Sequence, residues 1–343
     1  MENQIASQAI RSTKCKLPIP GQAARTTRSV VFSTLLAGGA MLVSFVSPVH
    51  AGAPMKKSQP GYYRIMVGDY EVTALSDGTT RWSADDVLTG ISKEEIGRRL
   101  TAAFLGTPLE ISINTYLVNT GKKLILIDGG AGNTIDKDSG HLVENLKAAG
   151  YEPGQVDEIY LTHMHLDHIG GLSNNGQRIF PNAVVHADRK ESAYWLSAKN
   201  AATVQRGKRS FTVAPAALQP YIAAGKYAPY DGDAELSPGI SSVANYGHTP
   251  GHNAYLISSK GQRLLVFGDL VHVQAVQFQL PEVAVGFDAD EHEAIADRRR
   301  TFDAIADQHE LVAAAHISFP GIGHIVKEGN GYRWDPVSYA VPR

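Results

Sequence analysis

The chain has 343 residues, of which 43% are hydrophobic and 19% charged, with a formal net charge of −2 at pH 7. This is ordinary composition for a soluble globular protein of one large or two modest domains. The acidic balance argues against a nucleic-acid-binding protein, because binding to phosphate needs clustered Lys and Arg.

An N-terminal leader is predicted from the first fifty residues. Arg25 and Arg28 precede an apolar run over residues 30–46, which is followed by "SPVHAGA". This order is typical of a secretory signal peptide, with cleavage expected after Ala51 or Ala53. An uncleaved anchor is the alternative, because about 17 apolar residues reach the lower limit for crossing a bilayer. The cleaved chain is expected to be periplasmic or secreted, without stable membrane insertion.

Removal of residues 1–51 changes the thiol content and the charge of the chain. The only cysteine, Cys15, lies in this leader, so the remaining chain has no thiol for a disulfide, a nucleophile or a Cys-based zinc site. The remainder, residues 52–343, carries 27 basic and 33 acidic residues, a net charge of −6. Its one basic cluster, "DRRRT" at residues 297–301, is predicted to be a solvated helix face.

Strands and helices alternate along the predicted domain. Strands are expected in residues 62–78, 111–130, 156–162, 182–187, 240–245, 253–259, 262–269 and 310–316, and helices in residues 141–151, 188–200 and 290–306. Asp188 is the expected N-cap of the second helix. Residues 200–238 are rich in Pro, Ala and Gly, which favours an insertion or lid with a helix near residues 216–224. Periodicity alone predicts an α/β or α+β fold.

A histidine cluster follows one predicted strand. The stretch "IYLTHMHLDHIGGL", residues 159–172, holds three of the 13 histidines of the chain. In extended chain His163 and His165 point the same way and can hold one ion, whereas Asp167 and His168 diverge toward a second. These nitrogen and oxygen ligands suit Zn²⁺, and also Mn²⁺, Fe²⁺ or Co²⁺. A polar surface loop is the alternative, which the preceding strand and the two following glycines disfavour.

Further metal donors lie at the ends of other predicted strands. "YGHTPGHN" supplies His248 and His252, "LLVFGDL" supplies Asp269, and "LVAAAHISFPGIGH" supplies His316 and His324. Loops and strand ends are where sheet scaffolds usually carry functional side chains. The sequence therefore predicts that several strand ends converge on one metal centre.

The ordered motifs "THMHLDH", "GHTPGH", "GDL" and a late histidine resemble those of the metallo-β-lactamase-fold hydrolases. Within that superfamily the chain is similar to the methyl parathion hydrolases and their lactonase and arylesterase relatives. The segments that carry this likeness include "GYYR", "YLVNTG", "NLKAAGY", "AVQF" and "AAHISFPGIGHI". The resemblance implies an αββα sandwich, with two mixed β-sheets flanked by helices in a single domain, and a homodimer.

The resemblance also implies a binuclear centre, with zinc as the first expectation. The implied ligands are His163, His165 and His252 for one ion, Asp167, His168 and His316 for the other, and Asp269 as a bridge. His248 is then expected to support a ligand from behind. Asp128, at the end of a strand, is a candidate for hydrogen-bonding a ligand.

The expected chemistry is hydrolysis by a metal-bridging hydroxide. Two ions roughly 3.5–4 Å apart lower the pKa of a shared water toward neutrality. No serine or cysteine nucleophile is then required, consistent with the lack of a "GxSxG" motif. Asp167 and Asp269 are candidate proton acceptors. The implied substrate-pocket residues are Trp82, Trp195, Phe211, Phe278 and Phe287, for each of which ordinary core packing is the alternative.

His272 is a departure from the phosphotriester-hydrolysing relatives, which carry an aliphatic residue at this position. Its N–H is expected to contact the substrate and to stabilise a tetrahedral carbon intermediate, unless it packs behind the metal ligands. We therefore expect lactones and aryl or carboxylic esters as principal substrates, with organophosphate triesterase activity secondary. Triesterase activity as the principal function is the alternative. A non-catalytic metal-binding protein is a remote one, because all seven implied ligands are present.

Overall fold

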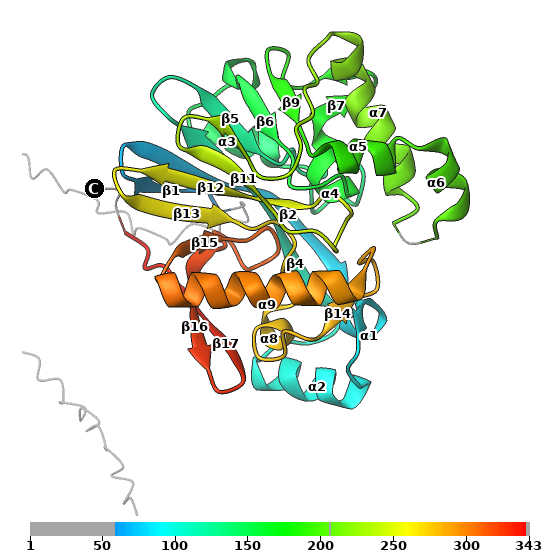
Figure 1. Ribbon diagram of the computed structural model, residues 1–343, viewed down its shortest axis with the longest axis vertical. Helices are drawn as coiled ribbons and strands as arrows, with labels where there is room; N and C mark the ends of the chain where they lie inside the picture. The colour runs from blue at the N-terminus through cyan, green and yellow to red at the C-terminus, as the bar shows by residue number, and fades with distance from the viewer. Residues whose placement is uncertain (1–58, 206, 341–343) are drawn as a thin grey trace, which may run out of the picture. The chain divides into compact units, whose positions relative to one another are not determined.

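The computed structural model describes residues 59–205 and 207–340 (Figure 1). The predicted leader, with its cleavage positions and Cys15, lies outside these residues. Among the described residues, no helix combines the length and the apolar character that crossing a membrane requires.

The first sheet is mixed and has the strand order β1-β2-β4-β5-β6-β9. Its strands are β1 (Tyr62–Val67), β2 (Tyr70–Trp82), β4 (Leu109–Asn119), β5 (Leu124–Ile127), β6 (Glu158–Tyr160) and β9 (Val184–His186). The strands from β1 to β5 pair antiparallel, whereas β5, β6 and β9 pair parallel. Both predicted hairpins, in residues 62–78 and 111–130, are confirmed.

The second sheet is also mixed and has the order β10-β11-β12-β13-β15-β16-β17. Its strands are β10 (Ala234–Ser237), β11 (Ile240–Ala244), β12 (Asn253–Ser259), β13 (Gln262–Val266), β15 (Leu311–Ala313), β16 (Ile322–Glu328) and β17 (Gly331–Pro336). The parallel pair is β13 and β15, which the chain joins through a long connection. Because of this pairing, segments far apart in the sequence end at the same edge of the sheet.

The helices are short, apart from α7 and α9. They are α1 (Ala84–Val87), α2 (Lys93–Ala102), α3 (Leu142–Ala148), α4 (Leu166–Ile169), α5 (Arg189–Trp195), α6 (Ala198–Thr203), α7 (Ser210–Ala223), α8 (Gln274–Gln277) and α9 (Glu291–Gln308). Smaller elements are the 3₁₀ helices η1 (Pro153–Gln155) and η2 (Gly170–Leu172) and the strand pairs β3 (Leu88–Thr89) with β14 (Ala284–Val285) and β7 (Ser173–Asn174) with β8 (Gln177–Arg178). Asp188 caps α5 by accepting a hydrogen bond from the backbone N of Lys190, as predicted.

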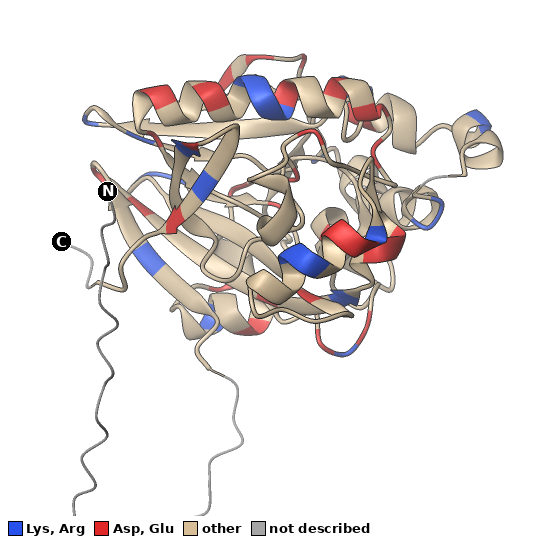
Figure 2. Cartoon of the chain, turned by 90° about the horizontal axis from the view of Figure 1, so that it is seen from below, with Lys and Arg blue, Asp and Glu red and all other residues tan. Residues whose placement is uncertain are grey.

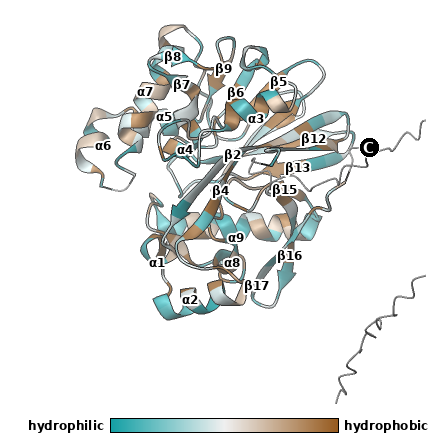
Figure 3. Ribbon diagram, turned by 180° about the vertical axis from the view of Figure 1, so that it is seen from behind, coloured by the Kyte–Doolittle hydropathy of each residue, from teal (hydrophilic) through white to brown (hydrophobic). Residues whose placement is uncertain are grey.

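Apolar side chains of the two sheets meet in a central core. Tyr116 and Ile127 of the first sheet and Tyr255 and Val266 of the second belong to this layer. Separate apolar clusters pack α3, α5 and α7 onto the first sheet and α9 onto the second. Figure 3 shows apolar residues gathered in strands such as β4, whereas α2 is mostly hydrophilic. This order of layers confirms the expected αββα sandwich.

The basic cluster at residues 297–301 is only partly the solvated face that the sequence predicted. Arg299 and Arg300 are exposed, but Arg298 is buried. Its guanidinium donates hydrogen bonds to the backbone oxygens of Leu270 and Val283, among others. α9 packs its apolar face on the sheet, and the chain after β13 crosses that face. Its buried carbonyl groups need hydrogen-bond donors, which Arg298 supplies. Acidic and basic residues lie side by side on the surface helices (Figure 2).

The predicted insertion or lid at residues 200–238 contains α6, α7 and β10. Leu218 and Tyr221 of α7 are fully buried in the cluster that covers the first sheet. The segment from Gly207 to Ser210, which leads into the first residue of this helix, lines a cavity instead. α7 is therefore part of the domain core, and the residues before it border the candidate site.

Candidate metal centre

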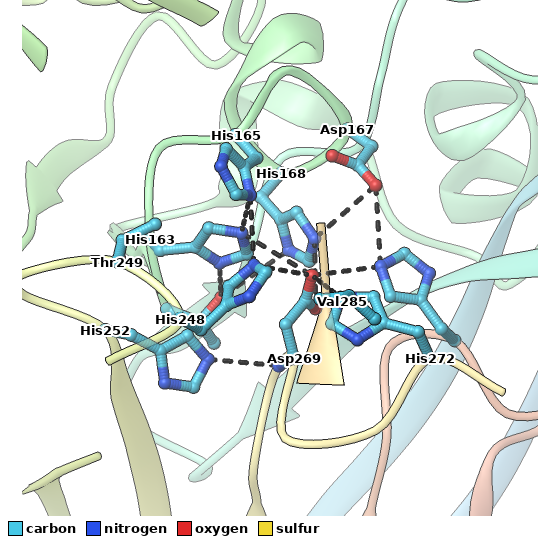
Figure 4. A network of polar contacts seen from close by, with 12 residues as sticks. His163, His165, Asp167, His168, His248, Thr249, His252, Asp269, His272 and Val285 are labelled. Atoms are coloured by element: carbon cyan, nitrogen blue, oxygen red, sulfur yellow. Dashed lines mark hydrogen bonds and ion pairs between the residues drawn. The ribbon is translucent and has the colours of Figure 1, made fainter. Parts of the chain in front are cut away.

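The candidate centre lies where loops from the two sheets meet (Figure 4). Residues 163–168 follow β6 of the first sheet. His248 lies in the loop between β11 and β12, Asp269 follows β13, and His316 follows β15. All of these side chains are buried. The topology therefore gathers ligand-type residues from four separate segments at one edge of the sandwich.

The histidine loop is held by Asp128, which follows β5. Its carboxylate accepts hydrogen bonds from the backbone N and the Oγ1 of Thr162, both at 2.8 Å. Asp128 has a φ of 65°, a conformation that is uncommon for residues other than glycine. Behind the loop, a Cβ at Gly171 would lie 2.2 Å from the backbone oxygen of Gly129, so only glycine permits this close approach.

A first group of donors consists of His163, His165, His248 and Asp269, whose donor atoms all lie within 4.8 Å of one another. Nδ1 of His165 lies 3.0 Å from Nε2 of both His163 and His248. Oδ2 of Asp269 lies 3.5 Å from Nε2 of His163 and 3.4 Å from that of His248. Three imidazoles and a carboxylate are a usual donor set for a divalent transition metal.

A second group consists of Asp167, His168 and His316. Oδ2 of Asp167 lies 3.7 Å from Nε2 of His168 and 3.4 Å from Nε2 of His316. Asp269 reaches this group too, because its Oδ1 lies 3.2 Å from His168 and its Oδ2 lies 3.1 Å from His316. Asp269 thus stands between the two groups, as a bridging ligand would.

The outward nitrogens of the histidines are fixed by partners behind them. Nδ1 of His168 lies 2.9 Å from Asp128, Nδ1 of His248 lies 2.7 Å from Asp288, and Nδ1 of His316 lies 2.9 Å from the backbone oxygen of Ser112. Such contacts set the tautomer and the ring orientation of metal-binding histidines. His165 is reversed, with Nδ1 turned inward. The prediction that Asp128 supports a ligand agrees with this geometry.

The structure places His248, and not His252, within the first group of donor atoms, whereas the resemblance implies His252 as the ligand and His248 as its support. Nδ1 of His252 lies 2.9 Å from the backbone oxygen of Asn245, and its Nε2 accepts a hydrogen bond from the backbone N of Asp269 at 3.0 Å. Burial lowers the pKa of His252 to about 3, so the ring is neutral and has one acceptor nitrogen, which is already occupied. In this arrangement His252 contacts the backbone of Asp269 and His248 lies among the donors, and the assignment of His252 as a ligand stays a prediction.

The electrostatics of the centre divide its histidines into two kinds. Nearby carboxylates, Asp269 first, outweigh burial and raise the pKa of His248 to about 9 and the pKa values of His168 and His316 above their usual value. Burial lowers the pKa values of His163 and His165 well below their usual value, and neighbouring imidazoles lower them further. Burial alone would raise the pKa of Asp269, but the surrounding histidines, His168 first, hold it well below its usual value. Metal binds to neutral imidazoles and ionised carboxylates, so binding at His168, His248 and His316 would release protons from these rings.

Unpaired buried atoms test whether these residues fit a pair of metal ions. Within residues 59–205 and 207–340, Nε2 of His168 and Oδ1 of Asp269 are buried and make no hydrogen bond, although the two atoms lie 3.2 Å apart. An unpaired buried polar atom is costly, so each of these needs a further partner. Both atoms point into the centre, where a cation would be that partner. The donor set fits two divalent ions.

A cavity of about 430 Å³ opens onto this centre. His165, Asp167 and Asp269 lie at its metal-ligand end. Trp82 and Phe287 form part of its wall, together with aliphatic side chains, Thr80 and the segment from Gly207 to Ser210. A cavity that combines apolar walls with polar groups is typical of a small-molecule site.

Three other predicted pocket residues lie outside the set of described residues that line this cavity. Phe278 packs in the core of the second sheet, with its ring centroid 5.4 Å from that of Phe302. Trp195 and Phe211 pack against each other beside α7, with centroids 4.5 Å apart. Trp195 also lies against the ring of His165, at 5.2 Å, so it supports a ligand-type residue without reaching the cavity.

His272 also lies close to the donor groups. It is buried, and its Nε2 lies 3.1 Å from Oδ2 of Asp269, the residue that stands between the two donor groups. Burial lowers the pKa of His272 to about 4, so its neutral ring donates from Nε2 to this carboxylate. His272 thus contacts Asp269 through Nε2, and its contact with a substrate stays a prediction.

Two supporting carboxylates were not anticipated from the sequence. Asp288 holds His248, and Glu191 of α5 holds the loops that carry the first donor group. Asp288 follows Phe287 in a loop with no metal-binding motif. Glu191 lies in a helix whose acidic residues look like surface positions. No spacing in the sequence distinguishes either of them.

The fold and the centre together define a metal-dependent hydrolase of the two-sheet class. The family model described as the metallo-beta-lactamase superfamily matches residues 109–316. The chain belongs to this superfamily, which confirms the resemblance inferred from the ordered motifs.

Individual relatives agree with this assignment. An N-acyl homoserine lactonase from Bacillus sp is 25% identical over 232 residues, which cover 62% of this chain and 83% of that protein. The crystal structure of hydrolase AbOPH of the beta-lactamase superfamily is 36% identical, with a TM-score of 0.79 over 83% of this chain and 100% of the other. AidC, a dizinc quorum-quenching lactonase solved with a product, is 28% identical, with a TM-score of 0.76 over 82% and 99%.

Proposed function

We propose that this protein hydrolyses lactones and aryl or carboxylic esters, with lactones as principal substrates. The observation that carries the proposal is the cavity of about 430 Å³ that ends on His165, Asp167 and Asp269. Its remaining wall combines aromatic and aliphatic side chains with Thr80 and the polar segment from Gly207 to Ser210. A neutral ester with an apolar acyl or aryl group matches such a cavity. Its scissile carbonyl would then lie at the donor groups.

The residues that would hold two divalent ions are those of the two donor groups. The first group is His163, His165 and His248, the second is Asp167, His168 and His316, and Asp269 is shared. When bound, such ions lower the pKa of water and polarise a carbonyl or phosphoryl oxygen. Zinc is the first candidate, because these donors are its common ligands and AidC is a dizinc protein.

The side chains around the centre have separate tasks in this proposal. Trp82 and Phe287, whose rings pack edge to face with centroids 5.5 Å apart, orient the apolar part of the substrate. Asp167 lines the cavity and contacts His168 and His316 through Oδ2, which places its carboxylate to accept a proton during hydrolysis. Burial of the centre excludes bulk water and strengthens each of these interactions.

Similarity to N-acyl homoserine lactonases and to AidC supports lactones over phosphotriesters. The Nε2–H of His272, donated to Asp269, adds a reason from the chain itself. It holds one orientation of the shared carboxylate, and the relatives that hydrolyse phosphotriesters carry an aliphatic residue here. We propose organophosphate triesters as secondary substrates. We also propose export after removal of residues 1–51, and a homodimer, on the sequence arguments given above.

The test is a kinetic comparison on purified, zinc-loaded protein that lacks the leader. The substrates are dihydrocoumarin, an N-acyl homoserine lactone, a simple aryl ester and methyl parathion, compared by kcat/KM. We expect the lactones to exceed methyl parathion by orders of magnitude, and a chelator to abolish all four activities. An Asp269→Asn variant, prepared in the same way, controls for contaminating esterases.

Each alternative outcome has a separate meaning. A higher kcat/KM for methyl parathion would leave the centre in place and reverse the order of substrates. Protein with two bound ions and no turnover of any ester would contradict the proposed function itself.

A further inference from the structure

Glu191 is a buried carboxylate that lies between two loops of the metal centre. It comes from α5 and is fully buried. Its Oε2 accepts a hydrogen bond from the backbone N of Met164 at 3.0 Å. Its Oε1 accepts one from the backbone N of Gly251 at 3.0 Å, and another from the hydroxyl of Thr249. All of these donors belong to the two loops.

The donors are the immediate neighbours of ligand-type histidines. Met164 lies between His163 and His165, and Thr249 follows His248. The first loop extends from the first sheet and the second from the second sheet. The carboxylate of Glu191 therefore joins the two loops, because Oε2 binds the loop of His163 and His165 and Oε1 binds the loop of His248. These two loops must lie close together for the first donor group to form.

The chemistry of this contact requires a carboxylate. All three partners are donors, two of them backbone N–H groups that cannot change role. A glutamine has one oxygen and one NH₂, so it would place a donor against either Met164 or Gly251. An unsatisfied buried donor costs about 1–3 kcal/mol. The site therefore discriminates between Glu and Gln although the two have almost the same shape.

The same helix contacts the first donor group a second time. Trp195, one turn after Glu191, packs against the ring of His165, with centroids 5.2 Å apart. The carboxylate holds the backbone beside His165, and the indole holds its ring. α5 thus constrains both the position and the orientation of one imidazole in the group.

We propose that Glu191 is a positioning residue for the first donor group, and that it sets the metal affinity there by fixing the separation of the His163–His165 loop from His248. The inference rests on the metal centre of the proposed function. Residues that orient metal ligands typically change metal affinity 10- to 100-fold when they are lost. Glu191 acts on two ligand loops at once, so we expect about that range.

The experiment compares wild-type protein with Glu191→Gln, using Co²⁺ and Zn²⁺ as probes. Chelator competition measures the affinity of each of the two ions. In the variant the affinity of one ion should be about 10- to 100-fold weaker than in the wild type, and the affinity of the other should be unchanged. The visible spectrum of the Co²⁺ protein should change in shape, because the geometry of one site changes. A purely structural role would lower thermal stability and leave the Co²⁺ spectrum of the folded protein unaltered.

Asp77→Asn is the matched control. Asp77 is another fully buried carboxylate that accepts three backbone N–H hydrogen bonds, from Ala131, Gly140 and Leu142. These partners lie outside both ligand loops. Its removal should leave the two Co²⁺ affinities and the spectrum as in the wild type.

A second variant keeps the test decisive if Glu191→Gln does not fold. Thr249→Val removes one of the three hydrogen bonds and keeps the shape of the side chain. It should weaken the same ion severalfold, and unchanged affinity in this variant would overturn the inference. Unchanged affinity for both ions in folded Glu191→Gln would also overturn it. Wild-type protein that binds no metal would contradict the proposed function instead.

Discussion

The two sheets contribute to the metal centre in different ways. The first sheet supplies its donors from one short loop, residues 163–168 after β6. The second supplies His248, Asp269 and His316 from three loops that follow different strands. One contribution depends on local backbone geometry. The other depends on the order of strands in a sheet and on a long connection between β13 and β15.

This difference decides which parts of the centre tolerate change. In the first sheet's loop, the donors are held mainly by residues close to them in space and sequence, such as Thr162, and by Asp128. In the second sheet, each donor needs its own support, as Asp288 gives to His248 and His252 gives to Asp269. A perturbation of the second sheet should therefore displace one donor at a time.

The largest effect is expected from the two histidines of "GHTPGH". His248→Ala removes a donor of the first group, and kcat/KM for a lactone should fall more than about a hundredfold, with loss of one ion. His252→Ala removes only the acceptor of the Asp269 backbone N–H, and a loss of about 10- to 100-fold is expected. Steady-state kinetics and metal analysis of both variants provide the measurement. A larger loss in His252→Ala would restore His252 as the ligand.

The next largest effect is expected from the carboxylates that support histidine donors, Asp288 for the second sheet and Asp128 for the first. Asp288→Asn should weaken binding of the ion at the His248 side, and Asp128→Asn binding of the ion at the His168 side, each about 10- to 100-fold. Each change removes the negative charge of the acceptor that orients one imidazole and replaces one of its oxygens by a donor. Chelator competition with Co²⁺ measures both affinities. If both variants lose the same ion, the two donor groups do not act as separate sites.

A smaller effect is expected at His272, which acts on the shared carboxylate. His272→Leu removes the hydrogen bond to Asp269, and hydrogen bonds to charged groups contribute about 1.5–3 kcal/mol. We expect kcat/KM for dihydrocoumarin to fall about tenfold or more, and the ratio of methyl parathion to lactone hydrolysis to rise. His272→Asn, which keeps a donor, is the control. An unchanged ratio in His272→Leu would remove His272 from the explanation of substrate preference.

The smallest effect on activity is expected from substitution of Asp77. This substitution should instead change the pH dependence of the free energy of unfolding. Burial raises the pKa of Asp77 from 3.8 to about 6, against the opposing effect of its backbone hydrogen bonds. The protonated form is therefore favoured on folding. The stability that this group contributes is complete below about pH 4 and is lost as the pH rises through about 6.

Denaturant unfolding of metal-free wild type and Asp77→Asn between pH 4 and pH 7 measures this contribution. The free energy of unfolding of the wild type relative to the variant should decrease by about 2 kcal/mol across this range. A difference that does not vary with pH would show that Asp77 has an ordinary pKa in the folded protein.

The comparison of the two sheets also explains what the sequence could predict. The loop of residues 163–168 was predictable because alternation and a following glycine pair define its geometry locally. Asp269 and His316 were predictable because each ends an apolar strand. His248 and His252 flank the same turn, and only the tertiary position of the Asp269 backbone decides between them. The sequence carries no information about how far each of these two histidines lies from Asp269.

The burial of two charged helix residues could not be predicted from the sequence, for a related reason. Glu191 and Arg298 are charged and lie in amphipathic helices, where charged residues are usually solvated. Their burial depends on backbone groups that are presented by loops of other elements. Phe278 shows the reverse case, because an aromatic residue close to Asp269 in the sequence packs into the core of the second sheet and not into the cavity.

The late position of His316 has a consequence for how the protein acquires its metal. His316 is separated from His168 by most of the second sheet, yet the two belong to one donor group. During synthesis the ribosome releases the first histidine loop long before this partner exists. A structural metal site rarely forms before its fold does. The ions should therefore be loaded after synthesis, and the metal supply of the compartment in which the chain folds should determine which ion it carries.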